Sequence, residues 1–150
     1  MTHAELAKSL FEQGHNCAQA VFLAFSDLTG MDRSAAMKLS ASFGGGMGRL
    51  REVCGAVSGM FMAAGLLYAS DNTDSQEEKA AHYARIRELA EAFRERNGSY
   101  ICRELLDRPD AVVGGDPQPR TAAYYTKRPC GQLCYDAAEI LDLYIENHPL

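Results

Sequence analysis

The chain has 150 residues, of which 47% are hydrophobic and 23% charged, and these values are typical of one globular domain with a continuous core. Its net charge of −5 argues against nucleic acid or an anionic membrane as a partner, because both attract clustered Lys and Arg. The first residues do not form a signal peptide, so we expect a cytoplasmic protein. In that reducing compartment its five cysteines would serve metal binding, catalysis or core packing rather than lasting disulfides.

Helical periodicity dominates the N-terminal part of the sequence. A first helix carries Leu6 and Leu10 and stops at Gly14. Asn16 is expected to cap a second helix that ends at Gly30, and Asp32 a short third one. The stretch 43–48 is too rich in glycine to continue a helix.

An almost wholly apolar stretch, 53–69, is the expected centre of the fold. It would reach about 25 Å as a helix, short of a comfortable membrane span, and so favours a helix buried by its neighbours. An amphipathic helix follows over 76–96, Ser99 caps a short helix, 107–129 forms a proline-rich loop, and a last helix begins near Cys130. We predict an all-α, single-domain bundle of six or seven helices around the glycine-containing central helix.

Four cysteines fall in the first turns of these helices: Cys17, Cys54, Cys102 and Cys130. Unpaired N–H groups and a partial positive charge at a helix N-terminus stabilise a thiolate, which is the nucleophile and the metal ligand. An arginine near Cys54, Arg49 or Arg51, would lower its pKa further. This placement favours a functional role.

Simple packing is the competing interpretation, because free cysteine is among the most buried residue types. Cys134 is its clearest candidate, since it lies one turn after Cys130 on the same helix face. The spacings match no CxxC redox motif, zinc finger, ferredoxin or haem site.

Taken together these residues resemble the C-GCAxxG-C-C family of redox-active proteins, named for four cysteines of which the second lies in a CGAxxG motif. Asn16-Cys17-Ala18 resembles the first site, and Cys54-Gly55-Ala56-Val57-Ser58-Gly59 the second. Cys102 resembles the third site and Cys130 the fourth, with Cys134 outside the pattern as a substitute for Cys130. The family's redox role is itself inferred from these cysteines, so the resemblance implies the site more firmly than the reaction.

The glycine loop lacks the spacing of a nucleotide-binding motif, but its N–H groups could form a nest for an anion. His15, two residues before Cys17, is a candidate proton donor or ligand. The candidate residues for binding a cofactor or small molecule are Gly44, Gly45, Gly46, Gly55 and Gly59.

Our leading hypothesis is that Cys17, Cys54, Cys102 and Cys130 converge into one redox site. It would work by thiol–disulfide exchange, or by holding an Fe–S cluster or another thiophilic metal for electron transfer. Two alternatives stay open: a partner-binding helical module with packed cysteines, and a small-molecule binder that uses the loop Gly44–Gly48. The sequence leaves the redox partner, the substrate and a homo-oligomeric state open.

Overall fold

The computed structural model describes all residues, 1–150, and shows an all-α fold with one isolated β-bridge, as the sequence predicts. Six helices of eight residues or more form the bundle, and shorter helical turns join them. The elements are α1 (His3–Glu12), α2 (Cys17–Ala24), α3 (Ser26–Thr29), α4 (Arg33–Ala41), α5 (Gly44–Met47), α6 (Gly55–Tyr68), α7 (Gln76–Asn97), α8 (Cys102–Leu105), the 3-10 turn η1 (Arg108–Asp110), α9 (Ala122–Lys127) and α10 (Cys130–Asn147).

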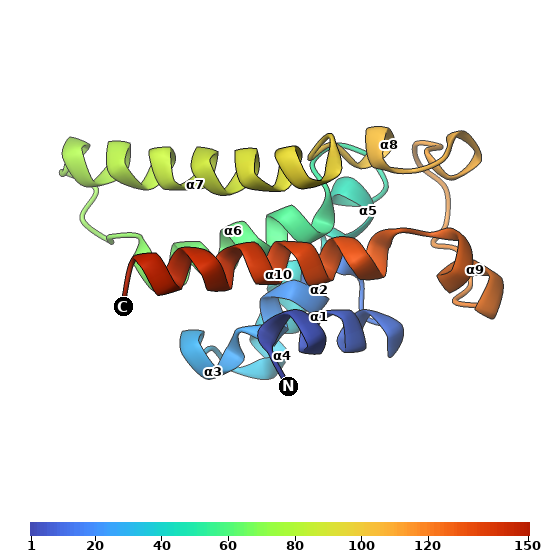
Figure 1. Ribbon diagram of the computed structural model, residues 1–150, viewed down its shortest axis with the longest axis horizontal. Coiled ribbons are helices and arrows are strands. Elements are labelled where there is room, and N and C mark those ends of the chain that lie inside the picture. The colour runs from blue at the N-terminus through green and yellow to red at the C-terminus, as the bar shows by residue number, and fades with distance from the viewer.

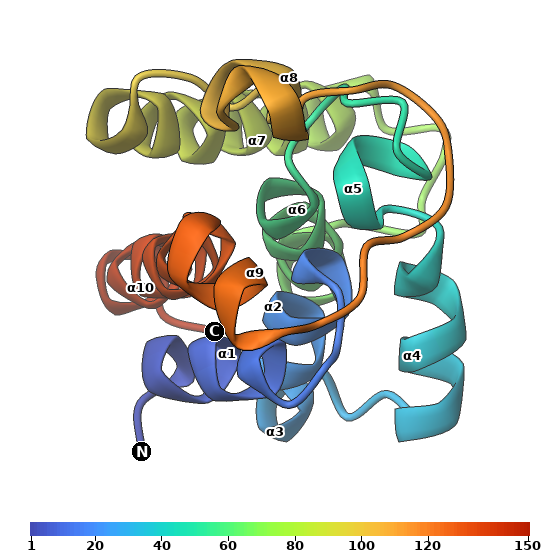
Figure 2. The same ribbon diagram turned by 90° about the vertical axis from the view of Figure 1, so that its right-hand side faces the viewer.

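Helix α6 occupies the centre of the bundle. It packs against α2, α7 and α10, and the end-on view shows it enclosed by them (Figures 1 and 2). It begins at Gly55 rather than at Val53, because Val53 forms an antiparallel bridge with Ile101 instead of joining the helix. None of the helices combines the length and the apolar character needed to span a membrane.

The small residues of α6 let α2 approach it closely. A Cβ placed on Gly59 would lie 2.7 Å from the carbonyl oxygen of Ala18, so any larger residue would push the two helices apart. Gly65, one and a half turns later, faces open space and has no such role.

Side-chain caps fix most helix starts where the sequence predicts them. Asn16 and Gln19 form a capping box at the start of α2, and Asp32 and Ser75 accept from the backbone at the starts of α4 and α7. The second helix, however, breaks at Phe25, and α3 continues to Gly30.

Two local expectations are wrong. Ser99 does not cap α8, because its hydroxyl accepts from Ile101 N–H and donates to Glu104, so that Ile101 is the N-cap and Cys102 the first helical residue. The stretch 107–129 is not a continuous loop, since it contains η1 and α9, and Thr121 caps α9. Both segments lie at the end of the bundle where α6 and α10 begin (Figures 1 and 2).

Candidate functional site

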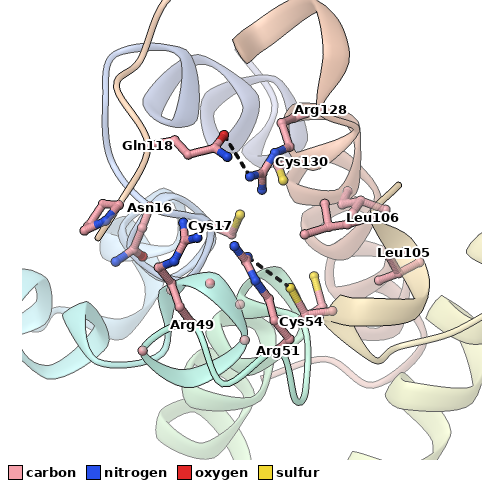
Figure 3. A pocket seen from close by; sticks show the side chains of 18 of the residues that line it. Asn16, Cys17, Arg49, Arg51, Cys54, Leu105, Leu106, Gln118, Arg128 and Cys130 are labelled. Atoms are coloured by element: carbon pink, nitrogen blue, oxygen red, sulfur yellow. Dashed lines mark hydrogen bonds between the residues drawn. The ribbon is translucent and has the colours of Figure 1, made fainter. Parts of the chain in front are cut away.

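A cavity of about 290 Å³ lies where α2, α6, α8 and α10 begin, and four cysteines line it (Figure 3). Cys17, Cys102 and Cys130 are each the first residue of a helix, and Cys54 is the N-cap of α6. The structure thus brings together four thiols that are far apart in the sequence. They are not scattered through the core, as the packing interpretation would require.

The isolated bridge explains why Cys54 lies near Cys102. Val53 pairs with Ile101, Cys54 N–H donates to the carbonyl of Tyr100 at 2.8 Å, and Cys102 N–H donates to the carbonyl of Glu52. These bonds align the two segments just before α6 and α8 begin. No sequence pattern predicts this pairing, because a single bridge leaves no alternation of polar and apolar residues.

Close packing of α2 on α6 brings Cys17 to the same place. A Cβ on Gly55 would lie 3.1 Å from the Cβ of Cys17, so Gly55 permits this approach. Helix α10 packs against both α1 and α2, and its first turn supplies Cys130 from the other side of the cavity.

The thiols of Cys17, Cys130 and Cys134 lie close enough to change one another's pKa. Cys130 lowers the pKa of Cys17, whereas Cys134 raises it. The Cys134 sulfur lies 3.8 Å from the carbonyl oxygen of Cys17. Cys134 is fully buried and does not line the cavity, whereas Cys17 is partly exposed and Cys130 lines it. Between the two thiols of α10, Cys130 is therefore the one with access to a ligand.

Burial outweighs the helix N-termini: backbone N–H groups of Ala56 and Val57 lower the pKa of Cys54, as expected, but the net shift is upward. Burial raises the pKa of Cys54 to about 12, and it also raises the pKa of Cys134. The neighbouring thiol of Cys17, together with burial, raises the pKa of Cys130 well above its usual range. Cys130 lowers the pKa of Cys17, but Cys134 and burial outweigh it, so this pKa is also well above its usual value.

Arginine acts on a different cysteine from the expected one. Arg51 donates from Nη1 to the sulfur of Cys102 at 3.7 Å, rather than contacting Cys54 (Figure 3). Burial raises the pKa of Cys102, and Arg51 opposes that shift. Arg49 donates instead to the carbonyl of Gly114 at 2.8 Å.

The glycine loop has an unusual left-handed backbone. Residues 45–49 all have positive φ, including Met47 and Arg49, and Arg51 follows with φ 60°. Each non-glycine residue in this region costs about 1 kcal/mol, so the loop stores strain beside the cavity. Its effect is to direct Arg49 and Arg51 toward the cavity, which both residues line.

The glycines named as candidate binding residues have different surroundings. Gly44, Gly45, Gly46 and Gly55 line the cavity, whereas Gly59 lies at the contact between α6 and α2. A Cβ on Gly46 would lie 2.6 Å from the Cβ of Cys102, so this glycine lets the loop touch α8.

His15 lies outside the cavity lining. Its ring nitrogen is 3.4 Å from Arg33, and burial lowers its pKa.

The cavity also contains residues that the sequence did not single out. Arg120, Tyr124 and Arg128 come from the segment expected to be a loop, and all line it. In the sequence, Arg128 lies two residues before Cys130, and Arg51 lies three residues before Cys54. This repeated placement of arginine close to cysteine is the signal that could have identified Arg128.

All five cysteines are free thiols, and no group of three or more His, Cys, Asp or Glu side chains is arranged to hold a metal ion.

Comparison with known proteins adds one finding. Residues 15–144 match the model of a protein family described as "Putative redox-active protein (C_GCAxxG_C_C)". No curated protein and no solved structure matches the chain.

Proposed function

Because this chain belongs to the C_GCAxxG_C_C family of redox-active proteins, we propose that it is a thiol–disulfide redox protein whose exchanging pair is Cys17 and Cys130. The observation that carries the proposal is that these two thiols line the same cavity, where each changes the pKa of the other. Two thiols in contact can form an intramolecular disulfide after a short movement. The more exposed of the two, Cys17, meets the substrate first.

The reaction is an exchange between two thiols and one disulfide. Cys17 loses its proton and attacks one sulfur of a substrate disulfide, which releases the first substrate thiol and leaves a mixed disulfide. Cys130 then loses its proton and attacks the Cys17 sulfur, which releases the second thiol. The protein gains the Cys17–Cys130 disulfide, and the substrate gains two electrons and two protons.

The two pKa shifts favour Cys17 as the attacking group. Cys130 lowers the pKa of Cys17, whereas Cys17 raises the pKa of Cys130, so Cys130 keeps its proton until the second step. Both thiols start protonated, so the exchange is faster in alkaline solution. A reducing compartment, for which we propose the cytoplasm, would keep the pair ready as a dithiol.

Cys54 and Cys102 form the opposite wall of the proposed site. The bridge between Val53 and Ile101 holds them, and Arg51 stabilises a thiolate on Cys102. In the proposed scheme they take the disulfide from the first pair by the same exchange, which oxidises Cys54 and Cys102 to a disulfide and returns Cys17 and Cys130 to thiols. Gly46 lets the glycine loop approach Cys102 closely, and Gly55 lets α6 approach Cys17.

The metal alternative uses the same residues differently. A soft metal or an Fe–S cluster would need Cys17, Cys54, Cys102 and Cys130 as thiolates. No group of three or more potential ligands is arranged to hold a metal ion, and the proposed exchange uses the thiols alone.

The test is to purify the protein anaerobically, oxidise it with one equivalent of diamide, and map disulfides by mass spectrometry. We expect one Cys17–Cys130 disulfide in the wild type and none in Cys17→Ser or Cys130→Ser. Cys134→Ser is the matched control, since it removes the neighbouring thiol outside the cavity and should leave the disulfide intact.

Iron, zinc and acid-labile sulfide are measured on the same sample. Stoichiometric metal together with unreactive thiols would replace exchange by metal binding as the function. Five thiols that stay reduced in the absence of metal would contradict both versions.

A further inference from the structure

Four guanidinium groups line the cysteine cavity, and no carboxylate does. Figure 3 shows Arg49 and Arg51 reaching in from the glycine loop and Arg128 from the start of α10. The fourth, Arg120, stacks over the ring of Phe11 at 4.3 Å. In a chain of net charge −5 this concentration of positive charge is local to one cavity.

Arg51 is the least satisfied of the four. It is only 2% exposed, its Nε donates to the carbonyl of Val112 at 3.0 Å, and its Nη2 has no hydrogen-bond partner. None of the salt bridges of the molecule, which reach to 4 Å, involves Arg51. A buried, unpaired charge is expensive for a fold unless something binds it.

Arg128 repeats the pattern on the facing wall. It is 8% exposed and donates from Nη2 to Gln118 at 3.0 Å, but its Nε has no hydrogen-bond partner. Asp110, at 3.6 Å, gives it a partial counterion from outside the cavity lining. Burial and the charges of Arg51 and Arg128 lower the pKa of Arg49, which shows that the three groups repel one another.

We propose that this cavity binds a small anion through Arg51 and Arg128, and that the disulfide substrate of the cysteines is a small molecule bearing such a group. The shared chemistry is a carboxylate or a tetrahedral oxyanion, either of which accepts paired hydrogen bonds from guanidinium. A volume of about 290 Å³ suits a small molecule. The identity of the substrate rests on the proposed function, but the anion site itself does not.

Binding of sulfate and of malonate to the reduced, full-length protein would be measured by calorimetry at constant ionic strength. The two probes separate an oxyanion from a carboxylate as the preferred group, and binding of either one supports the proposal. We expect Arg51→Met and Arg128→Met each to weaken binding at least tenfold. The matched control is Arg87→Met, which removes one exposed positive charge from α7.

Arg49→Met tests whether a folding defect could explain the weaker binding of the two buried-arginine variants. Arg49 is only half-buried and makes one hydrogen bond to Gly114, so its substitution should leave the fold intact. It too should weaken binding, with an unchanged circular dichroism spectrum. Cys17→Ser should bind as the wild type does, which separates the anion site from the redox chemistry. Absence of binding of both probes, or equal losses in Arg51→Met and Arg87→Met, overturns the proposal even if the Cys17–Cys130 disulfide forms.

Discussion

Charged and polar side chains have partners within the protein at one end of α10 and lack some of them at the other end. At the C-terminal end, Tyr144 stacks on His148 and meets Tyr68 edge-on. Arg85 donates to the hydroxyl of Tyr144 at 3.1 Å and to His82 at 2.8 Å, and its guanidinium lies over the ring of Tyr68. Each polar group there has a partner within the protein.

At the N-terminal end of α10, groups of the same kinds lack some of their hydrogen-bond partners. Arg51 and Arg128 each have an unpartnered nitrogen, the thiols are neutral and unpaired by disulfides, and the nearby loop is strained. The difference indicates that contacts at the C-terminal end of α10 stabilise the fold, whereas the N-terminal end sacrifices some stability for a reactive cavity. A substitution should therefore act on stability at one end and on chemistry at the other.

The largest effect on stability is expected at Gly46, where the glycine loop packs tightly against α8. In Gly46→Ala the new Cβ would clash with Cys102 and with the backbone of Arg51, at 2.6 and 2.8 Å, on a residue of positive φ. We expect a loss of more than about 3 kcal/mol in the free energy of unfolding, measured with urea.

Gly48→Ala is the matched control, because Gly48 also has positive φ but nothing within 4 Å. It should cost about 1 kcal/mol, the conformational penalty alone. Equal losses in the two variants would show that contact with Cys102 is not what requires Gly46.

Only some features of this structure could be predicted from the sequence. Periodicity and capping residues such as Asn16 and Asp32 predicted the long helices, because those signals are local. The first-turn positions of the cysteines followed from the same boundaries.

Other features depend on contacts between distant segments and could not be predicted. The bridge of Val53 with Ile101, the burial that keeps the thiols neutral, and α9 within an expected loop are examples. The left-handed turn lets the loop reach the cavity, and the glycines alone did not reveal that Met47 and Arg49 would share it.

A second prediction concerns alkaline pH at the cavity end. Because the pKa of Cys54 is about 12 in the folded state and near 9.0 when unfolded, the unfolded thiol ionises first as pH rises. The contribution of Cys54 should be constant below pH 9, and stability should fall above it, with each such thiol contributing up to about 1.4 kcal/mol per pH unit.

The measurement is urea unfolding between pH 8 and about 11, under reducing conditions. Cys54→Ala should flatten the decline relative to the wild type. An unchanged slope in this variant would mean that Cys54 is not held neutral by the fold.

The smallest expected effect lies away from the cavity. His3 contacts Asp142 at 2.7 Å and Asp27 at 2.9 Å, joining α1 to α10 and α3. Burial lowers the pKa of His3, but the hydrogen bonds with Asp27 and Asp142 outweigh it and the net shift is upward from 6.5. The stabilisation is therefore complete below pH 6.5 and is lost as pH rises through the folded-state value.

His3→Gln should cost about 1 kcal/mol at pH 6, since Asp27 is largely exposed and solvent screens the pair. The cost should shrink above pH 8, and the rate of disulfide formation at Cys17 should not change. Slower disulfide formation in His3→Gln would contradict the separation of the two ends.

The most direct test of the central claim is a redox titration of the full-length protein in glutathione buffers, with the Cys17–Cys130 disulfide quantified by mass spectrometry. If the two thiols act as one pair, the disulfide should appear in a single two-electron transition of about 30 mV per tenfold change in the ratio of oxidised to reduced protein. Cys134→Ser should keep that transition and Cys17→Ser should lose it. Separate oxidation of Cys17 and Cys130, each to a mixed disulfide with glutathione, would contradict the account.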